Sequence, residues 1–448
     1  MAVKTGLLRM GDFMNLSKPL ASPAMSTRPG RMALIRWCIY ACFFLSGFTA
    51  LVFEVLWSRQ FVTVFGNSAY AISIVLCAYM AGLGLGGLVG GRLADRITQW
   101  MPAYGAVQAG IAIWALVIPL LLDRLRLLVP ALPALSPDSL PISALTRFAL
   151  SFAILLVPCF LMGTTLPLLV RAVTNSNQSI GTRVGALYCW NTLGAAFGCL
   201  AAGFWMIVTL GLRLTNLVAV SDAFLVALAA FALSRPLARA ATAPAKAPSP
   251  EPMCLPAGQE PIKPVWRSGM FLLSVAFLNG LASLSCEVLW FRHLIFLDAG
   301  AYVFPTILCV YLLGLGLGGL IYSFFAQRIG LSTKALGILE MLLAISVLAT
   351  FVTGALLFAA GPPHRLELKG MVFITVFLPT VLMGMVFPLL CSVYGQQMQM
   401  LGRRIGLLFA VNTAGTVFGS LLPIFVLVPV LGIQMSLNIS KKIGRAHV

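Results

Sequence analysis

Two glutamates stand inside apolar segments of the sequence, and each is followed five residues later by an arginine. Glu54 and Arg59 begin and end the stretch Glu-Val-Leu-Trp-Ser-Arg, and Glu287 and Arg292 hold the same places in Glu-Val-Leu-Trp-Phe-Arg. Charged groups at membrane depth are unfavourable, so each of them suggests a functional role. Each pair could be an ion pair at a helix end near the lipid headgroups, where each partner lowers the cost of burying the other. Alternatively, the two carboxylates form a site for a cation such as a polyamine.

Two further acidic residues lie in apolar segments. Glu340 comes early in its segment, and alignment of the two halves of the chain places Gln108 at the equivalent position. A carboxyl that faces an amide across the boundary between repeats is a candidate proton-coupling site. The alternative is that Glu340 lies at the cytoplasmic mouth, shortly after Lys334. Asp222 lies in the middle of its segment, where it could bond with Asn216 or with a neighbouring helix.

Two asparagines recur in the same local sequence. Asn191 is followed by Gly194 and Gly198, and Asn412 by Gly415 and Gly419. Small residues four apart let two helices approach closely, and an amide in such a seam either joins the helices or contacts a ligand.

The stretch Gly91-Arg92-Leu93-Ala94-Asp95-Arg96 resembles the start of a loop signature of the major facilitator superfamily. It departs from that signature at Ile97-Thr98-Gln99, and Gln327 takes the place of Asp95 in the second half of the chain. The resemblance implies that Asp95 and Arg96 gate a transporter whose halves rock against each other. The alternative is an ordinary solvated helix end.

The sequence predicts no catalytic residue and no metal site. Its three histidines have no partners at ligand spacing, and no nucleophile elbow, P-loop or zinc pattern is present. The glycine ladders at 82–87 and 314–319 lie inside apolar segments, so they predict close helix packing rather than phosphate binding.

Composition indicates how these residues are held. Of the 448 residues 60% are hydrophobic and 9% are charged, and the mean hydropathy is +0.98, which a soluble domain would not tolerate. Apolar segments of roughly 20 residues match a hydrocarbon layer of ~30 Å, and helices satisfy their own backbone there. We expect an all-α polytopic membrane protein with eleven spans, at about 33–56, 68–91, 103–122, 146–170, 184–210, 214–233, 269–290, 301–324, 334–360, 370–394 and 405–431.

The formal net charge of +18 would suggest nucleic acid as the partner of a soluble protein. Here Lys and Arg are more than twice as numerous on the side of the N-terminal tail as on the other, which places the N-terminus in the cytoplasm and makes the lipid bilayer the partner. Most of the ten cysteines lie in apolar segments without a Cys-x-x-Cys pair, so we interpret them as buried thiols.

The chain is a tandem duplication, because the Glu-Val-Leu-Trp stretch, the glycine ladder and the asparagine segment each occur twice in the same order. An even number of spans in the first copy gives both copies the same orientation. The predicted division is a cytoplasmic tail (1–32), a first repeat of six helices (33–233), a Pro-rich cytoplasmic linker (234–267), a second repeat of five helices (268–432) and the start of a lost twelfth helix (433–448). Ile443 to Val448 matches the translation of a sequencing adapter, so we expect this tail to be an artefact.

One set of motifs resembles the membrane part of bacterial fused spermidine synthase-like proteins, namely Gly47…Ala50-Leu51…Glu54-Val55-Leu56-Trp57…Arg59, the first glycine ladder, Leu161-Met162-Gly163…Pro167 and Asn191-Thr192…Gly194…Gly198. In that family a major-facilitator-like module precedes an aminopropyltransferase domain. The resemblance implies decarboxylated S-adenosylmethionine as the co-substrate of a catalytic domain that this chain lacks.

We therefore expect the membrane module of such an enzyme, in the bacterial inner membrane. The alternatives are a freestanding secondary transporter of the major facilitator type, which moves polyamines or another small cationic solute, and a module that only anchors the enzyme. The sequence makes no prediction of the oligomeric state.

Overall fold

The structure is a computed structural model and describes residues 29–65, 69–128, 140–174, 180–241, 265–295, 303–329, 333–360, 365–395, 398–423 and 425–426. Every regular element in these ranges is a helix. The first half comprises α2 (Pro29–Phe65), α3 (Ala69–Arg96), α4 (Trp100–Leu128), α5 (Leu140–Val173), α6 (Ile180–Leu200), η4 (Ala201–Met206) and α7 (Ile207–Ala241). The second half comprises α8 (Val265–Ile295), α9 (Val303–Ile329), α10 (Thr333–Ala360), α11 (Arg365–Tyr394), η5 (Met398–Met400) and α12 (Leu401–Leu422).

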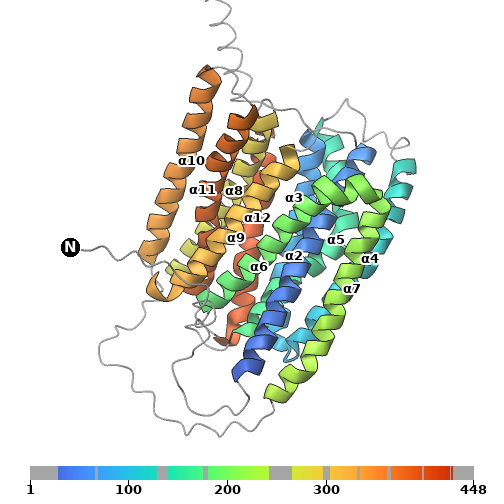
Figure 1. Cartoon of the computed structure of the whole chain (residues 1–448), viewed down its shortest axis with the longest axis vertical. Coiled ribbons are helices and arrows are strands. Elements are labelled where there is room, and N and C mark those ends of the chain that lie inside the picture. Colours follow the sequence, from blue (N-terminus) through green and yellow to red (C-terminus); the bar gives the residue numbers. More distant parts are fainter. Residues whose placement is uncertain are drawn as a thin grey trace, which may run out of the picture.

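Ten apolar helical segments in the described residues are long enough to cross a membrane. The fifth, Ile180–Pro236, is 57 residues long and holds two of the predicted spans. Its helix breaks at Gly211, whose φ of 72° and ψ of 177° are not helical. A residue with a side chain rarely adopts this φ, whereas glycine does so readily. The chain turns back at this glycine, and α7 descends beside α4 (Figure 1). The prediction of a polytopic all-α fold is confirmed.

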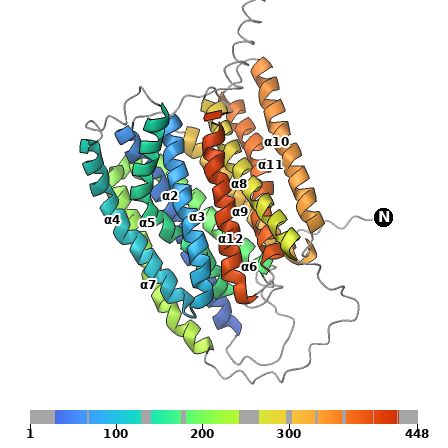
Figure 2. The ribbon, with the colours of Figure 1, turned by 180° about the vertical axis from the view of Figure 1, so that it is seen from behind.

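The two halves meet through two equivalent helix contacts. Helix α3 of the first half packs on α12 of the second, and α6 packs on α9. Since α9 is the repeat counterpart of α3, and α12 that of α6, one contact is the pseudosymmetric image of the other. Figures 1 and 2 both show these four helices in the middle of the bundle, with α10 on one outer side and α4 and α7 on the other. The internal repeat predicted from the motifs therefore defines the boundary between the halves.

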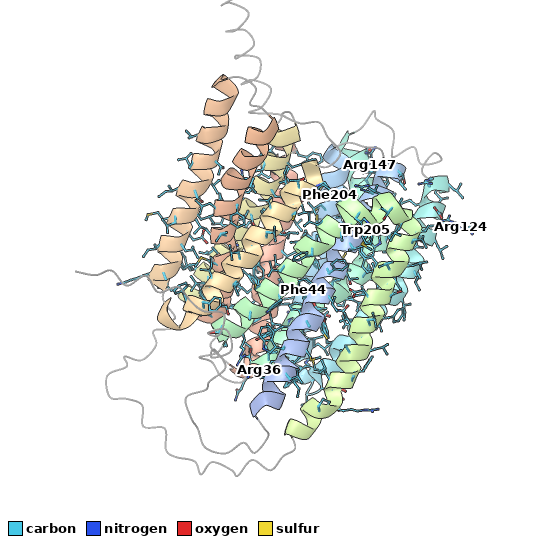
Figure 3. The ribbon with its side chains drawn as sticks, in the orientation of Figure 1. Arg36, Phe44, Arg124, Arg147, Phe204 and Trp205 are labelled. Atoms are coloured by element: carbon cyan, nitrogen blue, oxygen red, sulfur yellow. The ribbon has the colours of Figure 1, made fainter. Side chains whose placement is uncertain are left out.

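Glycines allow close helix crossings within each half. A Cβ on Gly194 of α6 would collide with the backbone of Phe44 on α2, and the equivalent Gly415 of α12 faces the backbone of Phe277 on α8 in the same way. Phe44 lies where α2 and α6 meet (Figure 3), with its ring 6.2 Å from that of Trp190. The small-residue spacing that follows Asn191 and Asn412 thus holds the first helix of each repeat against the fifth.

Charged side chains mark the two ends of the bundle. Figure 3 shows Arg36 near the end where α2 begins, and Arg124 and Arg147 near the opposite end. Phe204 and Trp205, close to the turn at Gly211, are 40% and 62% exposed, as expected for side chains that face lipid. Residues 1–28, most of the predicted linker (242–264) and residues 427–448, which include the predicted start of a twelfth helix (433–448), lie outside the described residues. Helix α7 extends past the predicted span end at 233.

Candidate functional site

A cavity of about 290 Å³ lies between the two halves. Residues from both repeats line it, and many of them are repeat counterparts of one another. The pairs are Ser46 with Asn279, Leu51 with Leu284, Glu54 with Glu287, Tyr79 with Tyr311, Met162 with Met383, Tyr188 with Phe409 and Asn191 with Asn412. The duplication therefore builds one central cavity with an approximately twofold-symmetric lining.

Glu54 and Glu287 both line this cavity. Both side chains are half-buried, and their carboxyl groups are close enough for the two charges to interact. Helix α2 continues beyond Glu54 to Phe65, so this glutamate does not end its helix. No ion pair joins it to Arg59 within the part of the chain that the structure describes. The side chain of Arg292 lies outside that part. The two carboxyl groups therefore lie in one cavity between the halves.

A tyrosine stands beside each glutamate. Tyr79 interacts electrostatically with Glu54, and Tyr311 with Glu287. The Tyr79 hydroxyl donates to the carbonyl oxygen of Ala50 (3.3 Å), and the hydroxyls of Tyr311 and Ser283 are 2.5 Å apart. The sequence analysis singled out neither Tyr79 nor Tyr311. Their recurrence as polar side chains within apolar segments was the available signal.

The asparagines lie both at helix crossings and in the wall of the cavity. Gly47 packs on the backbone of Asn191, and Gly280 packs on the backbone of Asn412. The side chains of both asparagines line the cavity. Asn412 accepts a hydrogen bond at its Oδ1 from Nδ2 of Asn279 (3.3 Å). Asn279, which the sequence analysis did not single out, is 8% exposed, and its Oδ1 has no hydrogen-bond donor within the described residues.

Gln108 and Glu340 occupy corresponding places in different halves, but they do not face each other. Helices α4 and α10 lie at opposite outer sides of the molecule (Figures 1 and 2), so the predicted pairing across the boundary between repeats is wrong. Gln108 instead donates to Ser46 Oγ (2.5 Å) and Tyr104 Oη (3.0 Å) within the first half. The third helix of each repeat packs outside the four central helices, which is why neither residue reaches the boundary.

Asp222 bonds with a neighbouring helix, one of the two predicted alternatives. It accepts a hydrogen bond at Oδ2 from Thr49 on α2. Asn216 instead donates to the carbonyl oxygen of Ala115 (3.0 Å). Both contacts attach α7 to the rest of the first half, and neither residue lines the cavity.

Asp95 connects the two halves at one end of the bundle. Its Oδ1 and Oδ2 accept hydrogen bonds from the backbone nitrogens of Gly402 (2.8 Å) and Arg403 (2.7 Å), in the first turn of α12. Arg171 Nε lies 3.3 Å from Asp95 Oδ1. A carboxylate at a helix N-terminus satisfies free backbone donors and interacts favourably with the helix dipole. Arg96 is exposed, so the gating interpretation suits Asp95 and the solvated-end interpretation suits Arg96.

The described residues contain no group of three or more His, Cys, Asp and Glu side chains that could hold a metal ion. The described lining of the cavity offers two carboxylates, three phenols and several amides. Such groups can form reversible hydrogen bonds and ionic contacts with a polar solute.

No protein-family model and no curated protein matches the chain. Solved structures of the major facilitator superfamily match its fold. The proton:xylose symporter XylE, bound to 6-bromo-6-deoxy-D-glucose, has a TM-score of 0.55 at 12% identity, over 90% of this chain and 90% of that one. A bacterial homologue of the iron transporter ferroportin, in an outward-facing state, has a TM-score of 0.54 at 14% identity over 87% and 90%. The human organic anion transporter MFSD10 has a TM-score of 0.55 at 16% identity over 86% and 92%.

These likenesses show that the fold is that of the major facilitator superfamily. The main functional prediction was the membrane module of a fused spermidine synthase-like enzyme, and these matches correct it. Transporters match about nine-tenths of this chain and about nine-tenths of their own length. The motifs that suggested the enzyme family instead perform packing and cavity-lining roles: Trp57 is buried and stacks on Phe53 with ring centres 5.0 Å apart, while Glu54 faces the cavity.

Proposed function

We propose that this major-facilitator-type protein is a secondary transporter that moves a small organic cation through the cavity between its halves. The observation that carries the proposal is the pair Glu54 and Glu287, one from each repeat, in a single cavity whose described lining contains no arginine or lysine. Two carboxylates at membrane depth are unfavourable unless they meet positive charge, so a cationic solute offsets their burial.

The rest of the lining supports the same class of solute. Tyr79 and Tyr311 present aromatic rings beside the carboxylates, and ammonium groups bind favourably over such rings. The amides of Asn191 and Asn412 can bond with polar groups of the solute. A volume of about 290 Å³ is at the lower end of ligand pockets, which favours a small molecule such as a diamine or polyamine.

Transport by this architecture requires that the cavity open to one side at a time. The halves touch mainly through the α3 to α12 and α6 to α9 contacts, and a rocking motion would separate them at one end and then at the other. Asp95 stabilises closure at its own end. With the N-terminus in the cytoplasm of a bacterial inner membrane, as the distribution of Lys and Arg indicates, that end is cytoplasmic.

The proposal is tested by flux of a labelled diamine, putrescine, into liposomes that contain the purified protein. We expect putrescine flux into liposomes with wild-type protein to exceed the flux into protein-free liposomes. Glu54→Gln or Glu287→Gln should lower the protein-dependent flux at least tenfold, since a hydrogen bond to a charged group contributes about 1.5–3 kcal/mol. Asp123→Asn is the matched control, because Asp123 is an exposed carboxyl outside the central cavity. Wild-type flux no greater than that of empty liposomes, or glutamate variants as active as Asp123→Asn, would overturn the proposal.

A further inference from the structure

A column of aromatic side chains lines the seam where α2 packs along α6. Trp37 and Phe44 lie seven residues apart on α2, which puts them on one stripe of that helix. Trp190 and Phe197 have the same spacing on α6. The ring of Trp190 is 5.8 Å from that of Trp37 and 6.2 Å from that of Phe44, and Figure 3 shows Phe44 in this seam. Trp37 and Phe197 are exposed, so the column faces lipid.

Two arginines lie at the end of this column where α2 begins. Figure 3 shows Arg36 at that end, and Arg183 lies seven residues before Trp190 on the same stripe of α6. Gly194 packs on the backbone of Phe44, which sets the register of the two helices. Phe44 and Gly194 differ by 150 in residue number and the two arginines by 147, so the arginines are three residues, or about 4.5 Å, apart along the helix axes. Their guanidinium groups are close enough for the two charges to interact.

No acidic group neutralises this pair within the described residues. Neither Arg36 nor Arg183 forms an ion pair or a hydrogen bond there, and none of the described carboxyl groups interacts electrostatically with Arg36. Both side chains are half-buried. Two like charges held together at partly buried positions repel each other, and a bound anion offsets that repulsion. Arginine binds phosphate through two parallel N–H groups, so the pair has the chemistry of a phosphate site.

The second half does not repeat this pair of arginines. Gly269 of α8 takes the place of Arg36. Arg404 of α12 takes the place of Arg183, but its Nη1 donates to the carbonyl oxygen of Tyr394 (2.9 Å), and its guanidinium group lies over the ring of the same tyrosine. The protein thus satisfies the single arginine of the second half internally, whereas the first half holds two arginines together without such an acceptor among the described residues.

We infer that the seam binds an anionic phospholipid, with its phosphate at Arg36 and Arg183 and one acyl chain along the aromatic column. With the N-terminus in the cytoplasm, this end of α2 lies in the inner leaflet, where basic pockets between membrane helices bind anionic headgroups. The column continues from the arginines towards the middle of the bilayer, as an acyl chain does. A free phosphate ion would use the arginines but not the column, so we assign the site to lipid. The inference does not depend on what the protein transports.

The test measures the affinity of the purified protein for two lipids, in detergent and by native mass spectrometry. Phosphatidylglycerol is anionic, whereas phosphatidylcholine with the same acyl chains is zwitterionic. We expect the wild-type protein to bind phosphatidylglycerol about 25-fold more tightly, since each of two basic residues contributes about 1 kcal/mol, or about fivefold. Arg36→Gln and Arg183→Gln should each weaken phosphatidylglycerol binding about fivefold and leave phosphatidylcholine binding unchanged.

Three further variants separate the parts of the inference. Arg92→Gln is the matched control and should bind both lipids as the wild type does, because Arg92 is exposed near the end of α3, at the same end of the bundle but outside the seam. Arg36→Lys keeps the positive charge and should retain most of the preference for phosphatidylglycerol, which distinguishes loss of charge from loss of folding. Trp37→Ala should weaken the binding of both lipids alike, because the acyl chain contacts this ring whatever the headgroup.

Equal affinity of the wild-type protein for the two lipids would overturn the inference. A loss in Arg92→Gln as large as in Arg36→Gln would overturn it as well, since any positive charge at this end would then serve. Arg36→Lys that binds as weakly as Arg36→Gln contradicts the role of the charge. Displacement of bound phosphatidylglycerol by an excess of inorganic phosphate, or unchanged affinities in Trp37→Ala, would assign the arginines to a free anion and exclude the lipid.

Discussion

The carboxylate of Asp95, at the end of α3, accepts a hydrogen bond from the backbone nitrogen of Gly402 at the start of α12 (2.8 Å), so a side chain of the first repeat caps a helix of the second. The second half has Gln327 at the position equivalent to Asp95. An amide has a weaker interaction with a helix dipole than a carboxylate has. The charged cap is therefore confined to one of the two equivalent helix contacts.

Replacing Asp95 with Ala should weaken closure at this end of the bundle. Loss of a helix N-cap costs about 0.5–2 kcal/mol, which would raise the ratio of open to closed protein about 2- to 30-fold. The measurement is the labelling rate of a cysteine placed at Ala94, which is buried, by a membrane-impermeant thiol reagent, in a background without native cysteines. Arg96→Ala changes an exposed neighbour and should leave the labelling rate unchanged. Equal rates in the two variants would contradict the capping role.

A methyl group on Gly86 should destabilise the first half. Its Cβ would collide with the backbone of Phe160 on α5, so the helices would have to separate. We expect Gly86→Ala to lower the midpoint of thermal unfolding in detergent. Gly337→Ala provides the comparison, because a Cβ there meets nothing within 4 Å. In that exposed helix interior, alanine is favoured over glycine by about 0.8–1 kcal/mol, so the midpoint should rise. A loss of stability in Gly337→Ala as large as in Gly86→Ala would show that packing at Gly86 is not the cause.

Alanine at Gly211 should be unfavourable for a different reason. No atom lies within 4 Å of a Cβ built at this position, but its φ is 72°. A positive φ with ψ near 180° is a region that essentially only glycine occupies, and holding another residue there costs roughly 1–3 kcal/mol, so Gly211→Ala should lower the unfolding midpoint by backbone strain alone. Gly337→Ala, at an equally open position without a positive φ, should not lower it. An equal loss of stability in the two variants would argue against strain.

Removing the Tyr311 hydroxyl should weaken binding in the cavity. Tyr311→Phe removes the group that bonds with Ser283 and lies beside Glu287, and one hydrogen bond contributes about 0.5–1.5 kcal/mol, or roughly a 2- to 12-fold change in affinity. The half-saturating putrescine concentration in the flux assay is the measurement. Tyr322→Phe removes a comparable bond, to Ser392 (2.7 Å), away from the cavity and should leave that concentration unchanged. A matching shift in both variants would assign the effect to general stability.

Much of the architecture could be predicted from hydropathy and repetition. Apolar segments, the doubled motifs and the glycine spacing each specify local properties that the bilayer and close packing impose on a sequence. The positions of Glu54 and Glu287 were harder to predict, because hydropathy falls at the Glu-to-Arg stretch and suggests a span end near residue 56. Helix α2 in fact continues to Phe65, since these polar residues face the interior and their exposure to lipid is limited.

Contacts between helices far apart in the sequence could not be predicted in this way. The aligned positions of Gln108 and Glu340 suggested a pair across the boundary, but sequence equivalence says nothing about which helices are central. Packing places α4 and α10 on the outside, where Gln108 bonds with Ser46 of its own half. The resemblance to an enzyme family failed for a related reason: motifs that shape helix crossings can be shared by proteins with different activities.

The turn at Gly211 has a mechanical consequence. The fifth and sixth spans are joined there by a single non-helical residue, and Thr215 donates back to the carbonyl oxygen of Gly211 (2.7 Å). With no slack between them, these spans form a stiff hairpin. Because α6 touches the second half and α7 is attached to α2 and α4, displacement of α6 at the boundary is transmitted directly to the outer surface of the first half. The membrane around α7 would therefore experience each change of state, and bilayer thickness or stiffness would enter into the rate of the cycle.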